Sequence, residues 1–109
     1  MPVCRILLIL LMMFLPLTAF GLTPEEVLVV ANKNAAESVG LARYYMKMRQ
    51  IPKKNLVVLK MTDQETCSRK AYVEQAAGPV RIFLKNNPQI RAIATIYGVP
   101  LRIYTPALN

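Results

Sequence analysis

The chain has 109 residues with 14 basic and 6 acidic side chains, two cysteines and no histidine. The length allows one domain at most, and without histidine neither a Ser–His–Asp triad, nor a Cys–His pair, nor the usual zinc ligand is available. The formal net charge of +8 comes from basic residues spread along the chain, so a solvated surface is the preferred interpretation and an anionic partner is the alternative. No helix-turn-helix, zinc-finger or aromatic RNA-binding pattern accompanies the charge, so we expect no nucleic-acid partner.

Residues 1–21 have the three parts of a secretory signal peptide. Arg5 supplies the positive start, Ile6–Leu15 is an unbroken apolar run, and Ala19-Phe20-Gly21 fits the small–x–small pattern before a cleavage site. The run is too short for an ordinary membrane span. We therefore expect export to the periplasm, cell envelope or exterior, with membrane contact only before cleavage. An uncleaved anchor is the alternative. Cleavage removes Cys4 and leaves Cys67 with no internal disulfide partner.

Residues 22–109 read as the N-terminal part of one α/β domain. After a polar turn, Val27–Ala31 is a continuous apolar run, which predicts a strand covered on both faces. Asn34 and Glu37 have the spacing of a capping box, so a helix is predicted over 35–50. Pro52 follows its expected end.

The second half of the chain repeats this pattern. A strand is predicted over 55–61, a polar loop over 62–68, a helix over 69–87 and a third strand over 92–97. Gly78-Pro79 lies inside the second helix and predicts a kink or a division into two short helices. The segment 101–106 has little room to complete a sheet.

The predicted order β-α-β-α-β implies two right-handed crossovers between parallel strands. In doubly wound sheets the first and third strands commonly lie side by side, with the second strand outside the first. The prediction is a partial doubly wound, three-layer α/β fold with strand order 2-1-3. Three strands lack later partners, so we interpret the chain as a truncated piece of a larger domain.

In such sheets the ligand crevice lies beyond the carboxyl ends of the strands, where the strand order reverses. Asn32 and Asn34 follow the first strand, and Tyr97, Gly98 and Arg102 follow the third. These five residues are candidate ligand-binding residues. Plainer roles are a turn residue for Asn32, a helix cap for Asn34, strand core for Tyr97, a tight turn for Gly98 and exposed surface for Arg102.

The loop after the second strand adds three candidates, Glu65, Thr66 and Arg69. Cys67 lies among them near a helix start, where a thiol pKa can be lowered. No general base is visible nearby, so a structural thiol is the preferred interpretation. Thr66 is also an ordinary cap candidate.

Several well-known sites are missing from the sequence. It contains no G-x-G-x-x-G, no G-x-x-x-x-G-K-[ST] and no G-x-S-x-G. Two loop carboxylates, Asp63 and Glu65, are a weak signal for a hard cation. We therefore predict no metal and no cofactor.

Three blocks together resemble an uncharacterised family of exported bacterial proteins that co-occurs with exosortase-type sorting systems. They are Val29–Met46, Arg49–Leu56, and Glu65–Arg69 together with Tyr97–Arg102. The resemblance covers nearly all of the mature chain. Family members are longer and carry no established activity, so no catalytic residue can be transferred. The resemblance implies an envelope setting linked to surface polysaccharide and protein sorting.

Two hypotheses of function follow. The first is an accessory envelope protein that binds a cell-envelope component or an anionic polysaccharide. The second is the N-terminal part of a hydrolase, such as a caspase- or gingipain-like cysteine peptidase, whose catalytic residues would lie beyond Asn109. The second rests on fold analogy alone.

Overall fold

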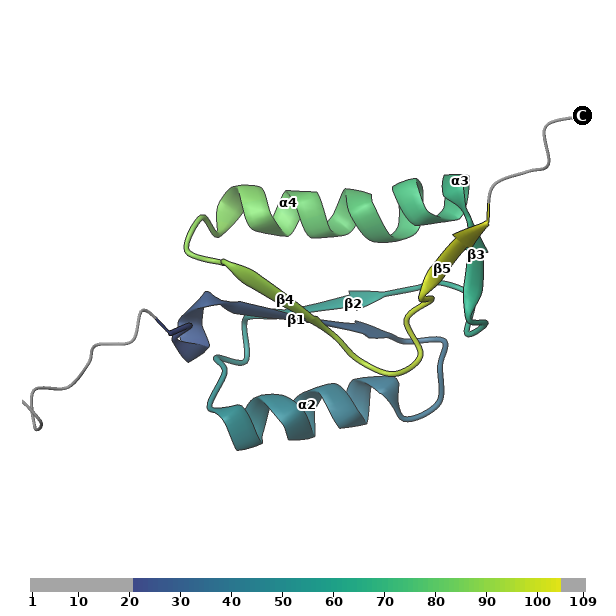
Figure 1. Cartoon of the computed structure of the whole chain (residues 1–109). Helices are drawn as coiled ribbons and strands as arrows, with labels where there is room; N and C mark the ends of the chain where they lie inside the picture. The colour runs from purple at the N-terminus through teal and green to yellow at the C-terminus, as the bar shows by residue number, and fades with distance from the viewer. Residues whose placement is uncertain (1–20, 105–109) are drawn as a thin grey trace, which may run out of the picture.

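The computed structural model describes residues 21–104, in which helices cover both faces of a parallel sheet (Figure 1). The predicted signal peptide lies outside the described residues except for Gly21. Within 21–104, none of the helices combines the length and apolar character needed to span a membrane. A single 3-10 turn, η1 (Pro24–Glu26), occupies the predicted polar turn before the first strand.

The main sheet has three parallel strands in the order β2-β1-β4. β1 (Val27–Asn32) is central and pairs with β2 (Leu56–Leu59) on one side and β4 (Ala92–Thr95) on the other. The predicted α/β class and strand order, second–first–third, are therefore confirmed. β2 and β4 are shorter than the predicted 55–61 and 92–97.

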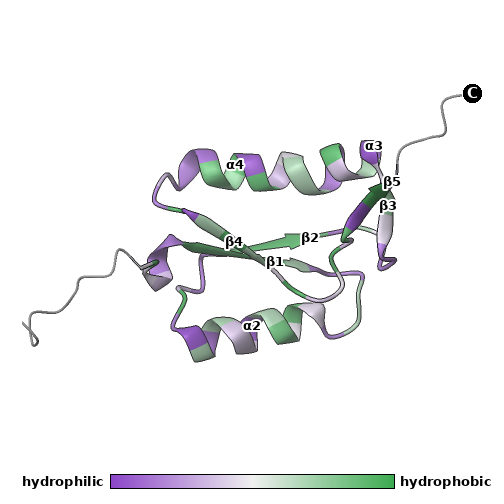
Figure 2. Ribbon diagram, in the orientation of Figure 1, coloured by the Kyte–Doolittle hydropathy of each residue, from purple (hydrophilic) through white to green (hydrophobic). Residues whose placement is uncertain are grey.

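Helices on both faces explain the continuous apolar run of β1. α2 (Ser38–Arg49) covers one face and packs on Val29 and Ala31. A continuous helical run of α3 (Arg69–Ala71), η2 (Tyr72–Ala77) and α4 (Gly78–Asn86) covers the other face and packs on Leu28 and Val30. Figure 2 shows the hydrophobic residues concentrated along β1 and β2, between the helices. Burial on both faces, about 25 cal/mol per Å² of apolar surface, holds these layers together.

A second sheet was not predicted. β3 (Thr66–Ser68) and β5 (Arg102–Tyr104) form a two-stranded parallel ladder beside the carboxyl end of the main sheet (Figure 1). The prediction of a loop over 62–68 is therefore wrong for residues 66–68, and the segment expected to have little room to complete the main sheet supplies β5 of the second sheet. Strands of three residues are too short for the alternation of apolar and polar residues that identifies a strand in a sequence. Their pairing depends on the backbone of residue 65, whose carbonyl accepts from the N–H groups of Leu101 (2.8 Å) and Arg102 (3.1 Å).

The predicted capping box at the start of α2 is also wrong. The helix begins at Ser38 rather than residue 35, and its N-cap is Glu37, in the left-handed region with φ 67° and no side-chain capping bond. The Asn34 side chain donates instead to the Met61 carbonyl (3.0 Å). Residues 33–37 form a turn, because the strand end must swing out of the sheet before the helix can pack on it.

The expected disturbance at Gly78-Pro79 takes the form of a π-helical segment, η2. The Gly78 N–H donates to the Val73 carbonyl, a bond of the i→i−5 type. Pro79 has no backbone N–H and cannot donate the i→i−4 hydrogen bond of an α-helix. The wider π-helical turn before it accommodates this missing bond. Ser68, at the N-cap of α3, accepts from the Ala71 N–H (3.0 Å).

Candidate functional site

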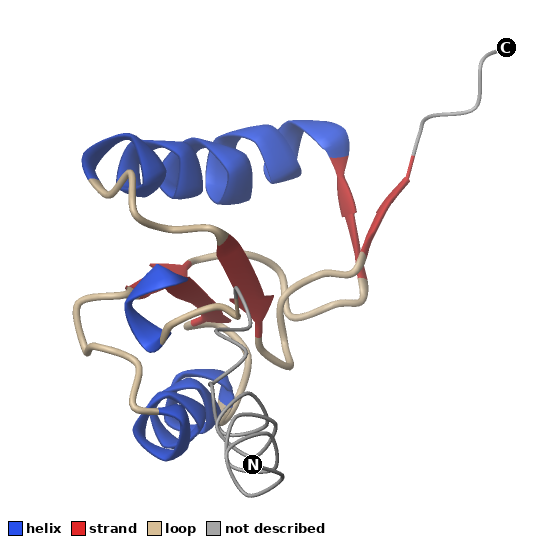
Figure 3. Cartoon of the chain, turned by 60° about the vertical axis from the view of Figure 1, so that its left-hand side comes forward, coloured by secondary structure: helices blue, strands red, loops and turns tan. Residues whose placement is uncertain are grey.

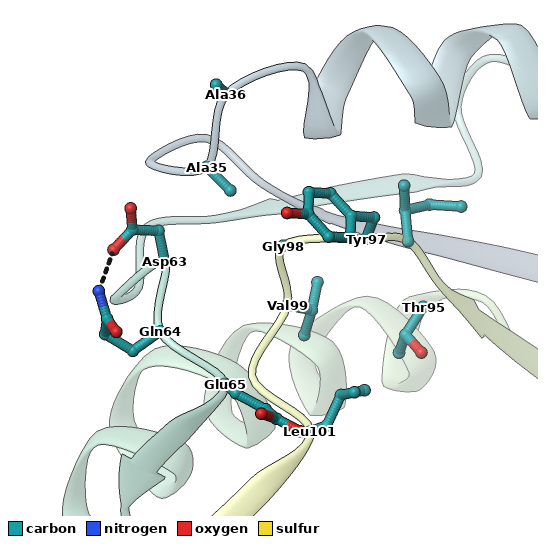
Figure 4. Close-up of a pocket in the computed structure, with 11 residues that line it drawn as sticks. Ala35, Ala36, Asp63, Gln64, Glu65, Thr95, Tyr97, Gly98, Val99 and Leu101 are labelled. Atoms are coloured by element: carbon teal, nitrogen blue, oxygen red, sulfur yellow. Dashed lines mark hydrogen bonds between the residues drawn. The ribbon is translucent and has the colours of Figure 1, made fainter.

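The carboxyl ends of β1, β2 and β4 converge at one edge of the sheet, as the sequence predicts. A pocket of about 530 Å³ opens there. Three chain segments line it, as Figure 4 shows: the turn after β1 at Ala35-Ala36, the loop after β2 at 63–65, and the segment 95–99 that begins at the last residue of β4, with Leu101 beside it.

Asn32, the last residue of β1, connects these segments. Its side-chain Nδ2 donates to the carbonyls of Thr62 (2.9 Å) and Gly98 (2.8 Å). Its Oδ1 accepts from the N–H groups of Met61 (3.1 Å) and Asn34 (3.3 Å). One amide thus contacts the loop after each of the three strands. An Asn amide has two donors and two acceptor positions, and all four are used here.

Because Asn32 is completely buried and its amide is fully engaged, we assign it a positioning role. Its backbone N–H is also satisfied, by Ser38 Oγ at 2.9 Å. Ser38 is likewise fully buried and lies at the start of α2. Sequence reasoning missed Ser38, because the helix was expected to begin at residue 35 and would have placed this serine on an ordinary helical turn.

Tyr97 and Gly98 line the pocket from the β4 side. The Tyr97 side chain is 78% exposed, so the alternative of strand core is wrong for it. Gly98 has φ 98°, which confirms the predicted tight turn. A Cβ at Gly98 would also overlap the Cβ of Ala35. This close approach allows the loops after β1 and β4 to meet over the sheet edge.

The loop after β2 contributes the polar wall of the pocket. Asp63 Oδ1 accepts from Gln64 Nε2 (3.2 Å), and the Gln64 N–H donates to Thr62 Oγ1 (3.2 Å). Glu65 Oε1 lies 4.0 Å from Arg102 Nε, with both side chains exposed. An exposed pair of this kind contributes little to stability.

The predicted site residues therefore fall into two groups. Glu65, Tyr97 and Gly98 line the pocket. Asn34 lies beside it on the turn after β1, and Arg102 contacts the pocket residue Glu65 without lining the pocket itself. Thr66 and Arg69 are exposed on β3 and α3 and do not line the pocket. Ala35, Ala36 and Leu101 were not predicted, because single apolar side chains give no sequence signal of a ligand.

Cys67 lies away from this pocket. It is 4% exposed, free, and packed in the cluster between β1 and the α3–η2–α4 run. This placement agrees with the structural role preferred for the thiol. Across residues 21–104, no group of three His, Cys, Asp or Glu side chains could hold a metal ion.

Comparison of the chain with protein-family models, curated proteins and solved structures finds no match. The resemblance to the exosortase-associated family and the hydrolase alternative both stay predictions.

Proposed function

We propose that this chain is an exported accessory protein of the cell envelope that binds a neutral saccharide in the pocket at the carboxyl edge of its sheet. The observation that carries the proposal is the lining of that pocket, where an exposed tyrosine faces a loop with two carboxylates and an amide. Fixed polar groups beside an apolar surface are typical of small-molecule pockets.

A sugar ring offers two kinds of surface, and the pocket has a counterpart for each. Its hydroxyl groups donate hydrogen bonds that the Asp63 and Glu65 carboxylates can accept. Its C–H faces carry slight positive charge and pack against the negative face of an aromatic ring such as that of Tyr97. Because the Asn32 amide fixes the backbone of the loops on both sides, the loops that carry these groups are positioned before a ligand arrives.

The charge of the pocket narrows the ligand class. Asp63 and Glu65 would repel an anionic polysaccharide. Arg102, 4.0 Å from Glu65, offsets part of this negative charge but does not line the pocket. The pocket therefore favours a neutral saccharide over the anionic one that the net charge of the whole chain suggests.

Binding is favoured over hydrolysis by the placement of the same carboxylates. Glycosidases place two carboxyl groups on opposite sides of the bond that they cleave. Asp63 and Glu65 lie on one loop, along one wall of the pocket (Figure 4). Asp63 also accepts a hydrogen bond from Gln64.

The binding proposal is tested by titrating the chain with neutral oligomers of glucose and of N-acetylglucosamine, and with an oligogalacturonate as the anionic comparison. We expect the neutral class to bind more tightly. Tyr97→Ala should weaken that binding about tenfold, equivalent to ~1.4 kcal/mol. Tyr44→Ala is the matched control, since Tyr44 is 64% exposed on α2 and does not line the pocket. Equal losses in both variants, tighter binding of the anionic oligomer, or no binding of any oligomer would contradict the proposal.

The exported setting follows from the predicted signal over 1–21. Mass spectrometry of the envelope and cytoplasmic fractions checks it independently of binding. We expect a mature N-terminus at Leu22 in the envelope fraction. Intact chain confined to the cytoplasmic fraction would show the export prediction to be wrong.

A further inference from the structure

A basic stretch, residues 43–56, runs from the middle of α2 to the first residue of β2. It has no acidic side chain and five basic ones, all exposed: Arg43, Lys47, Arg49, Lys53 and Lys54. α2 follows the end of β1 and precedes the start of β2, so this stretch ends at the amino edge of the sheet, opposite the pocket proposed to bind saccharide. Figure 3 brings this end forward and shows the loop that leads from α2 to the sheet.

A second pocket, of about 740 Å³, opens within the basic stretch. Its polar lining consists of three of the five cations, Arg43, Lys47 and Lys53, and the amide of Gln50. The remaining lining is apolar and includes the buried Met46. Every lining residue belongs to 43–56, so one continuous segment builds the pocket.

The helix dipole explains only part of this arrangement. Cations are favourable in the last turn of a helix, which accounts for Lys47 and Arg49. Arg43 lies six residues before the end of α2, beyond the range of that effect, and Lys53 lies outside the helix. Arg43 and Lys47 are also four residues apart, a spacing at which like charges on a helix repel each other. An anion bound between them would relieve this repulsion.

Within residues 21–104, no carboxylate pairs with the three cations of this pocket. The two ion pairs found there are Glu26–Arg91 and Glu65–Arg102. Arg49, which does not line the pocket, lies over the Tyr45 ring, with its guanidinium carbon 5.6 Å from the ring centroid. The pocket therefore gathers positive charge that this part of the chain does not neutralise.

Gln50 adds a neutral hydrogen-bond donor to the cations. It is the C-cap of α2 and has φ 58°, in the left-handed region. Glycine or asparagine usually occupies such a position after a helix. Glutamine instead keeps a long side chain there, and its amide can donate two hydrogen bonds in the pocket.

We propose that this second pocket binds a phosphate group carried as a monoester. Such a group has nearly two negative charges at neutral pH and three strong acceptor oxygens. The planar guanidinium of Arg43 matches phosphate oxygens, and Lys47 and Lys53 add two point charges. A carboxylate has a single charge and would compensate the three cations less. The inference goes beyond the proposed saccharide site and does not rest on it.

An NMR titration of the chain with glycerol 3-phosphate at low salt tests the proposal. We expect saturable shifts of the backbone signals of 43–56, no movement of 63–65 and 95–98, and weaker binding as salt is added. Lys53→Gln should weaken binding about fivefold, as for the loss of one exposed ion pair. Lys54→Gln is the matched control, because Lys54 is adjacent and exposed but does not line the pocket.

A second pair of variants repeats the comparison within the last turn of α2. Lys47→Gln should weaken binding, while Arg49→Gln should leave it unchanged. Equal weakening by the pocket variants and their controls would overturn the proposal, since binding would then follow the general surface charge. Absence of saturable shifts with glycerol 3-phosphate would also overturn it. If vesicles of phosphatidylglycerol alone bind, the basic stretch contacts a membrane surface instead and the phosphate monoester is wrong.

Discussion

Asn32 shows how one buried side chain can connect the loops that follow three strands. Its position at the end of the first strand made it a candidate ligand in the sequence, and the structure places it at the same edge. The difference lies in its partners, since four backbone groups from three loops use up the amide. Sequence could locate this residue, but its hydrogen-bond partners depend on loops that meet only in the folded chain.

Asn32→Leu keeps the approximate volume and removes every one of these bonds. We expect the free energy of unfolding to fall by about 3 kcal/mol, because buried N–H and C=O groups lose their partners. The comparison is Asn34→Ala, which removes one partly buried bond to Met61 and should cost about 0.5–1 kcal/mol. Urea denaturation of the two variants measures the difference. Similar losses in both would show that Asn32 does not hold the loops together.

At the scale of elements, prediction succeeded where segments are long and periodic. The three strands of the main sheet and both helical regions were found from their apolar runs, and continuous apolarity correctly indicated a strand buried on both faces. It failed at β3 and β5, whose three residues each carry no period, and at the start of α2, where a left-handed Glu37 replaces the expected cap. Tertiary packing decides such short segments.

The joint between β3 and α3 carries a prediction at this scale. Ser68 ends the strand and caps the helix, so Ser68→Ala should lower the free energy of unfolding by about 1 kcal/mol. Thr66→Ala is the matched control, because Thr66 is an exposed hydroxyl residue on the same strand with no capping bond. Thermal and urea unfolding should separate the variants. An equal effect of both substitutions would mean that the cap contributes nothing to the helical run.

At the scale of the whole molecule, sequence could place the candidate site at the carboxyl edge of the sheet, where the structure has a pocket, because parallel strands bring their ends together. It could not indicate the sign of charge there. The chain as a whole has a net charge of +8, whereas the pocket is lined by two carboxylates, Asp63 and Glu65, and by no lysine or arginine. Local charge depends on which loops fold over the edge, and this is why we propose a neutral rather than an anionic saccharide as the ligand.

The most direct measurement is a ¹⁵N–¹H NMR titration of the chain with a neutral oligosaccharide. The account predicts that the backbone signals of 63–65 and 95–98 shift in a saturable manner, while the side-chain amide signals of Asn32 move little because that group is already fully bonded. Saturable shifts confined to other surfaces, large shifts of the Asn32 side-chain amide alone, or no shifts with any neutral oligosaccharide would contradict it.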